Sequence, residues 1–150
     1  MKAEDKELLI KDLSARLPYG VKVQIDLQSN IYPPMICKVC NIEFAEMGSS
    51  FIGVEVLPDS YSEYREFLCK PYLFPLSSMT EEQREEFLNI QKDERQILTD
   101  ALIDYKYGKR DRIPTIASYK HIDWLNTYHF DYRGLIEKDL ALDATGMNIY

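Results

Sequence analysis

Two histidine–aspartate pairs near the end of the sequence could serve acid–base or metal chemistry. His121 and Asp123 form the first pair, and His129 and Asp131 form the second, eight positions later. An imidazole beside a carboxylate suits both tasks because it titrates near neutral pH. On one helix, however, the two imidazoles would lie about 12 Å apart, which is too far for a single metal ion. We therefore favour a structural role over catalysis: His129 caps a helix C-terminus, and Asp131 accepts a hydrogen bond from Arg133 or a backbone amide.

The cysteines offer a second candidate site. Cys37 and Cys40 have the two-residue gap of a zinc site or a redox pair. Structural zinc needs four ligands, and Cys69 and the two histidines do not supply a second pair at a suitable spacing. A strand would also point the two thiols to opposite faces. We expect reduced core cysteines, with no metal and no cofactor.

The stretch 105–112 (YKYGKRDR) is the basic segment of the chain, and aromatic residues alternate with its cations. Single-strand nucleic-acid binders use this combination. The four cations are Lys106, Lys109, Arg110 and Arg112. A solvated helix end capped by Gly108 is the better explanation of them, because cations suit the negative pole of the helix dipole. The formal net charge of −7 repels a polyanion, so we favour the helix end and keep nucleic-acid binding as the alternative.

The segment from Asp123 to Lys138 is the densest group of aromatic and polar side chains, and it contains the only tryptophan, Trp124, which we expect to be mostly buried. The residues in it that could form a binding surface are Tyr128, His129, Asp131, Tyr132 and Arg133. The chain has eleven tyrosines, including Tyr61 and Tyr64 in an expected loop, and tyrosine is enriched at protein interfaces. We predict a non-enzymatic interaction protein that self-associates or binds another protein. A small enzyme using His129 and Asp131 is the least favoured alternative.

Size and composition fit one soluble domain. A chain of 150 residues with 45% hydrophobic and 29% charged residues can bury a core without disulfides or metal. Its first residues are charged, and no apolar stretch has the length of a bilayer span. An odd number of cysteines, three, fits reduced thiols. We therefore expect a cytoplasmic protein that does not bind membranes.

Hydrophobic periodicity divides the first half into one helix and four strands. Apolar residues at helical spacing predict a helix over Glu4–Leu17, which Pro18 ends. Alternating apolar and polar residues predict a strand over Val21–Leu27. Runs bounded by turn residues predict further strands over Met35–Phe44, Phe51–Leu57 and Tyr64–Leu73. Pro71 marks the end of the last strand as a sheet edge. The result is an antiparallel meander, which either stays open or curls toward a small barrel.

The second half changes to helical signals after Pro75. Residues 80–83 (TEEQ) form a capping box that starts a helix. The segment Asn89–Ile116 forms either one helix or two, and a further helix is expected over Ala117–Phe130. We therefore predict a single α+β domain, with the N-terminal helix and meander in residues 1–75 and mainly helices, packed on the sheet, in residues 76–150.

Three blocks of this sequence carry a resemblance. They are residues 11–21 (KDLSARLPYGV), 70–82 (KPYLFPLSSMTEE) and 124–138 (WLNTYHFDYRGLIEK). In this order they resemble a family of short uncharacterised proteins from gut anaerobic bacteria and their phages or mobile elements. The resemblance implies a bacterial cytoplasm and a possible prophage or mobile-element origin, and it carries over no functional site.

Overall fold

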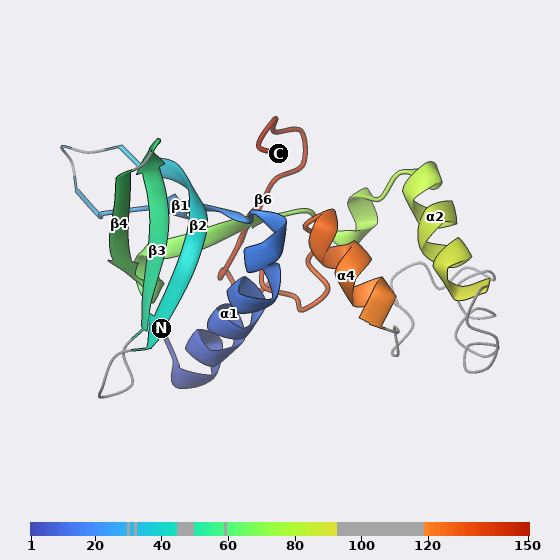
Figure 1. Cartoon of the computed structure of the whole chain (residues 1–150), viewed down its shortest axis with the longest axis horizontal. Helices are drawn as coiled ribbons and strands as arrows, with labels where there is room; N and C mark the ends of the chain where they lie inside the picture. Colours follow the sequence, from blue (N-terminus) through green and yellow to red (C-terminus); the bar gives the residue numbers. More distant parts are fainter. Residues whose placement is uncertain (30, 32, 45–49, 59, 93–118) are drawn as a thin grey trace.

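The computed structural model describes residues 1–29, 31, 33–44, 50–58, 60–92 and 119–150. Within them the chain has an α+β fold, with one helix before an open six-stranded sheet and further helices after most of its strands (Figure 1). The basic stretch 105–112 lies outside the described residues. The nucleic-acid alternative built on Lys106, Lys109, Arg110 and Arg112 therefore stays a prediction, as does the number of helices in Asn89–Ile116.

Helix α1 spans Ala3–Arg16, close to the predicted range. A single 3-10 turn, Leu17–Tyr19, follows it and ends at Gly20, whose φ of 69° lies in the left-handed region. Glycine adopts this region at no steric cost, so the chain can turn sharply there into the first strand.

The first four strands form the expected meander. They are β1 (Lys22–Ile25), β2 (Met35–Phe44), β3 (Ser50–Leu57) and β4 (Ser60–Arg65). The last two strands are β5 (Cys69–Leu73) and β6 (Leu142–Asp143). β5 lies antiparallel to β1, and β6 lies parallel to β5, so the order is β4-β3-β2-β1-β5-β6. The sheet does not close into a barrel.

The prediction of one strand over Tyr64–Leu73 is wrong. A 3-10 turn at Glu66–Leu68 divides this segment into the end of β4 and the whole of β5, which lie on opposite sides of the meander. Pro71 therefore lies inside the sheet, opposite Val23, and not on an edge strand. Tyr61 and Tyr64, expected in a loop, lie in β4.

The helices contribute to two separate hydrophobic clusters. Leu9 and Leu13 of α1 pack against the strands, together with Leu135 and Leu140 of the C-terminal segment. Helices α2 (Glu81–Lys92) and α4 (Tyr119–Thr127) belong to a second cluster, beside the sheet, and α4 also contacts α1 (Figure 1). The later helices join the sheet at the end of β5 and do not cover its core face, because α1 and residues 135–141 already fill that face.

The capping box at the start of α2 is confirmed. The backbone amide of Thr80 donates to Oε1 of Gln83 at 2.9 Å, and the amide of Gln83 donates to Oγ1 of Thr80 at 3.2 Å. These reciprocal bonds satisfy two amides that have no partner within the helix.

Candidate functional site

The predicted binding residues at 128–133 are built into a junction between α1 and the chain that follows α4. At its centre is Asp12 of α1, whose carboxylate accepts from Nε of Arg16 at 2.7 Å and from Nη2 of Arg16 at 3.1 Å. The same Nη2 donates to the carbonyl oxygen of Phe130 at 2.7 Å, and Nε of Arg133 lies 3.2 Å from Oδ1 of Asp12. Both side chains of the Asp12–Arg16 pair are fully buried. The pair therefore holds α1 to a segment more than one hundred residues away.

Tyr132 contacts both guanidinium groups. Its ring centroid is 5.2 Å from Arg16 and 4.8 Å from Arg133. Its hydroxyl accepts from Nη2 of Arg133 at 3.0 Å and donates to Oδ1 of Asn126 at 3.1 Å. These contacts engage the ring and the hydroxyl of the tyrosine, which suits a packed junction better than a binding surface.

Asp131 plays the structural role expected of it. Its two carboxylate oxygens accept from the backbone amides of Leu135 at 2.9 Å and Ile136 at 2.8 Å. Of the two predicted donors, the backbone is the one found, and Arg133 instead pairs with Asp12.

His129 ends the helix through its backbone. Its φ of 56° is left-handed, and its amide donates to the carbonyl oxygen of Asn126 at 3.1 Å. The imidazole is buried and stacks on the ring of Tyr150, with centroids 3.7 Å apart. Burial, with help from Arg16 and Lys22, lowers the pKa of His129 to about 4. At neutral pH the ring is therefore uncharged, so it does not cap the helix as a cation.

His121 belongs to a different environment. It is buried within α4, with its ring centroid 4.8 Å from that of Phe87. His129 lies beyond the end of this helix, so the two imidazoles do not share a helical face. Across the described residues, no three His, Cys, Asp or Glu side chains cluster as metal ligands.

The two neighbouring cysteines of β2 do point to opposite faces of the sheet, as expected. Cys37 is buried and Cys40 is exposed, so the expectation of a core position is wrong for Cys40. The register of β2 shifts between Val39 and Asn41, which places Cys40 at an irregularity in the strand. Burial raises the pKa of Cys37, and burial together with Glu66 raises the pKa of Cys69 to about 12.

We expect iodoacetamide to modify Cys40 of the native protein about 10-fold or more faster than Cys37 or Cys69, because reactivity requires an accessible thiolate. Peptide mapping by mass spectrometry at several times would measure the three rates. In urea the three rates should converge. Equal rates in the native protein would contradict the burial of Cys37 and Cys69.

On the outward face of the sheet, which points away from α1, the described residues cover the half over β1 and β5. Tyr72 of β5 packs there with Ala144 and Ile149 of the C-terminal segment. The hydroxyl of Tyr150 donates to the carbonyl oxygen of Tyr72 at 2.7 Å and accepts from the amide of Lys22 at 3.2 Å. Residues 142–150 therefore close the half of the outward face over β1 and β5.

The other half of the outward face carries a depression of about 560 Å³ over β2, β3 and β4. The residues that line it are Cys40, Asn41, Gly53, Tyr61, Ser62 and Glu63. Gly53 leaves room for the side chain of Asn41, because a Cβ atom at position 53 would meet Oδ1 of Asn41 at 1.5 Å. Tyr61 forms one wall and is 65% exposed.

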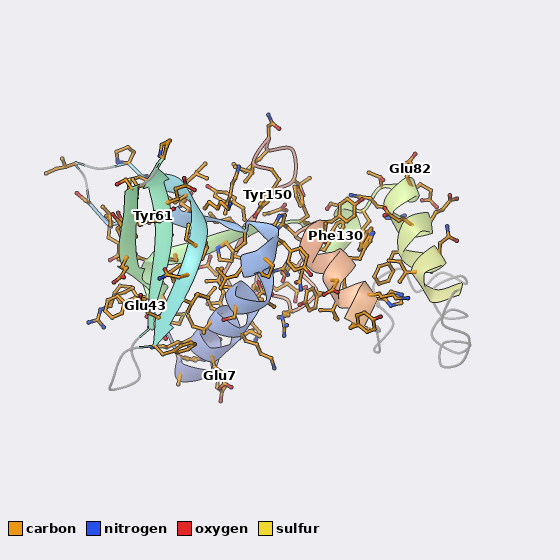
Figure 2. The ribbon with its side chains drawn as sticks, viewed as in Figure 1. Glu7, Glu43, Tyr61, Glu82, Phe130 and Tyr150 are labelled. Atoms are coloured by element: carbon orange, nitrogen blue, oxygen red, sulfur yellow. The ribbon has the colours of Figure 1, made fainter. Side chains whose placement is uncertain are left out.

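This depression adjoins an open edge of the sheet. β4 pairs with β3 on one side, and no other described strand lies along its second side. Figure 2 places Tyr61 at the end of the molecule opposite Glu82 of α2. We call the second side of β4, together with Tyr61, Glu63 and Arg65, the β4 edge.

The β4 edge was missed in the sequence, although a signal was present. Ser62 and Tyr64 alternate with Tyr61, Glu63 and Arg65, which is the period of a strand with a polar outer face. Pro58 and Ser60, both turn residues, obscured the start of the strand.

No described helix is long and apolar enough to cross a membrane. Comparisons with protein-family models, with curated proteins and with solved structures gave no match for this chain.

Proposed function

We propose that this is a non-catalytic interaction protein that binds an extended segment of a protein chain along the β4 edge. The observation that carries the proposal is the six-residue strand β4, which is paired on one side only among the described residues and bears the exposed Tyr61. An unpaired strand offers a row of backbone donors and acceptors to which an incoming strand can add.

The depression beside this edge supports the same function. In strand addition, main-chain hydrogen bonds supply affinity, and pockets for alternate side chains supply specificity. The depression is lined in part by Tyr61, Ser62 and Glu63 of β4 itself, so a long side chain of an added strand would have to reach across β4 to enter it. His129 and Asp131, by contrast, are engaged in the buried junction, which favours interaction over catalysis.

We further propose a bacterial cytoplasmic setting, with a phage or mobile-element origin. The three sequence blocks support the origin through their resemblance, and the three free cysteines suit a reducing compartment.

The proposal can be tested with peptides selected from a displayed random library against the purified protein. We expect the tightest peptides to slow hydrogen exchange of backbone amides in Ser60–Arg65, because a strand added at this edge protects its outward amides. Hydrogen-exchange mass spectrometry with and without peptide would measure the protection.

Two proline variants supply the matched control. Successive amides of a strand point to opposite sides, so one of Ser62→Pro and Glu63→Pro blocks the β4 edge and the other disrupts the pairing with β3. The variant that keeps the circular dichroism spectrum and melting temperature should lose peptide binding. Peptides that bind this folded variant as tightly as the wild type, or that protect only other segments, would overturn the proposal.

A further inference from the structure

We propose that the segment bound at the β4 edge carries an arginine whose guanidinium enters the depression over Gly53, against Tyr61 and Glu63 of β4. The inference rests on the proposed function and names the chemistry of the partner. It follows from three properties of the depression: a carboxylate with no side chain opposite it on β3, an oxygen acceptor beside Gly53, and an aromatic wall.

The outward side chains of β2, β3 and β4 lie in three rows across the strands. The rows are Lys38–Glu55–Tyr61, Asn41–Gly53–Glu63 and Glu43–Phe51–Arg65. In the first row Lys38 lies opposite Glu55, and in the third the guanidinium of Arg65 lies 5.3 Å from the ring centroid of Phe51. The centre of the middle row is a glycine, so β3 places no side chain opposite Glu63. Glu63 is therefore the acid of this face that has an open position beside it.

Asn41 supplies an oxygen acceptor beside Gly53. Its Nδ2 donates to Oε1 of Glu43 at 3.1 Å, which identifies the other atom of the amide as Oδ1. This oxygen lies 1.5 Å from the position that a Cβ atom of residue 53 would take, so it fills the place of the missing side chain in the depression. A carbonyl oxygen and a carboxylate that line one depression favour a cation with several N–H donors and repel an anion.

Tyr61 and the width of β4 select arginine among the cationic side chains. Tyr61 is 65% exposed and lines the same depression as Glu63. A side chain of an added strand has to cross β4, and strands lie about 4.8 Å apart, before it enters the depression. Arginine has this reach, and its planar guanidinium stacks on a tyrosine ring while its edge donates hydrogen bonds in several directions. The ammonium of lysine is compact and strongly hydrated, which suits this site less well.

The peptides selected against the purified protein test the arginine. We expect the tightest peptides that protect Ser60–Arg65 from hydrogen exchange to contain one. Glutamine in place of that arginine should weaken binding about 10-fold, because the ion pair and the contact with the tyrosine ring are both lost. Lysine in its place should weaken binding about 3-fold. Isothermal titration calorimetry would measure the affinities.

Glu63→Gln tests the same contact from the protein side, because it removes the charge and keeps the size of the side chain. We expect it to weaken the arginine peptide about 5-fold and the glutamine peptide by less than about 2-fold, since both changes remove the same ion pair. Glu85→Gln, the same change at an exposed position of α2, is the matched control and should leave both affinities unchanged. Circular dichroism of both variants confirms that the fold is retained.

Cys40 reports whether the depression itself is filled. Its thiol is exposed, and the residue lines the depression. At saturation the arginine peptide should slow the reaction of Cys40 with iodoacetamide about 5-fold or more, because the guanidinium and its stem cover the thiol. The glutamine peptide at saturation should leave this rate within about 2-fold of that of the free protein. The buried Cys37 and Cys69 serve as references, and peptide mapping by mass spectrometry measures all three rates.

The outcomes separate this inference from the proposed function. Peptides that protect Ser60–Arg65 but lack arginine, or that bind equally well with glutamine in its place, overturn the inference and leave the proposed function standing. Equal affinity of the arginine peptide for Glu63→Gln and the wild type, or an unprotected Cys40, overturns the position of the guanidinium. A lysine peptide that binds as tightly as the arginine peptide overturns the choice of a guanidinium. If no peptide protects Ser60–Arg65, the proposed function fails and this inference fails with it.

Discussion

Replacing Asp12 with Ala is expected to lower the free energy of unfolding by about 3–5 kcal/mol, because it leaves the charge of Arg16 buried without its carboxylate. Asp12 is fully buried and accepts from Nε and Nη2 of Arg16, while Arg133 lies against the same carboxylate. One side chain thus offsets the desolvation of Arg16 and neutralises part of a second guanidinium. Urea denaturation followed by circular dichroism would measure the loss.

Two further variants test whether the burial of Arg16 causes the loss of stability in Asp12→Ala. Glu81→Ala removes the exposed ion pair between Glu81 and Arg84, whose nearest atoms lie 3.3 Å apart, and should cost at most about 0.5 kcal/mol. The double variant Asp12→Leu/Arg16→Met removes both buried charges and should be more stable than Asp12→Ala, because no unpaired charge remains. A cost below about 1 kcal/mol for Asp12→Ala would mean that water reaches Arg16 in the folded protein.

Local signals in the sequence were sufficient for the first helix and the meander. Helical spacing of Leu9 and Leu13 predicted α1, and strict alternation predicted β1, because each element buries one face and leaves the other wet. Turn residues on either side predicted β2 and β3. The capping box at Thr80 is equally local, since both of its hydrogen bonds join residues three positions apart. Elements defined by their own residues could therefore be predicted.

The division of residues 60–73 into β4 and β5 depends on partners elsewhere in the chain. Pro71 is typical of an edge strand, yet β5 pairs with β1 on one side and with β6, some seventy residues later, on the other. The 3-10 turn at Glu66–Leu68 fits a long-range role for Glu66, whose carboxylate lies 2.9 Å from Nζ of Lys6 and accepts from the amide of Ser50. Such long-range contacts leave no periodic pattern in the sequence, so the turn could not be predicted from it.

Dependence on distant partners also explains why the segment 128–133 was interpreted as a binding surface. Its aromatic and polar residues are dense enough for one, and their partners Asp12 and Arg16 lie far away in α1. A buried polar network and an exposed binding surface use the same residue types, and burial alone separates them. The binding surface that we propose lies instead on β4, whose residues we had expected to form a loop.

Trp124 connects the helices of the second cluster. It is 8% exposed, as predicted, and its ring lies 5.3 Å from Phe87 of α2, 4.5 Å from Tyr128 and 5.6 Å from Phe130. Its indole Nε1 is buried and has no hydrogen-bond acceptor within the described residues. Packing, and not a hydrogen bond, is therefore what this side chain contributes to the fold.

Trp124→Ala should cost about 3–5 kcal/mol of unfolding free energy, because it opens a large cavity between α2 and α4. Trp124→Phe keeps an aromatic ring and removes the unpaired N–H, so it should cost only about 1 kcal/mol. Tyr119→Ala changes an exposed aromatic residue on the same helix and should stay within about 0.5 kcal/mol of the wild type. Urea denaturation followed by circular dichroism applies to all three, whereas tryptophan fluorescence is lost with the only tryptophan in the two Trp124 variants. If Trp124→Phe proved as costly as Trp124→Ala, the indole N–H would have to bind an acceptor, and the role of Trp124 would be polar as well as steric.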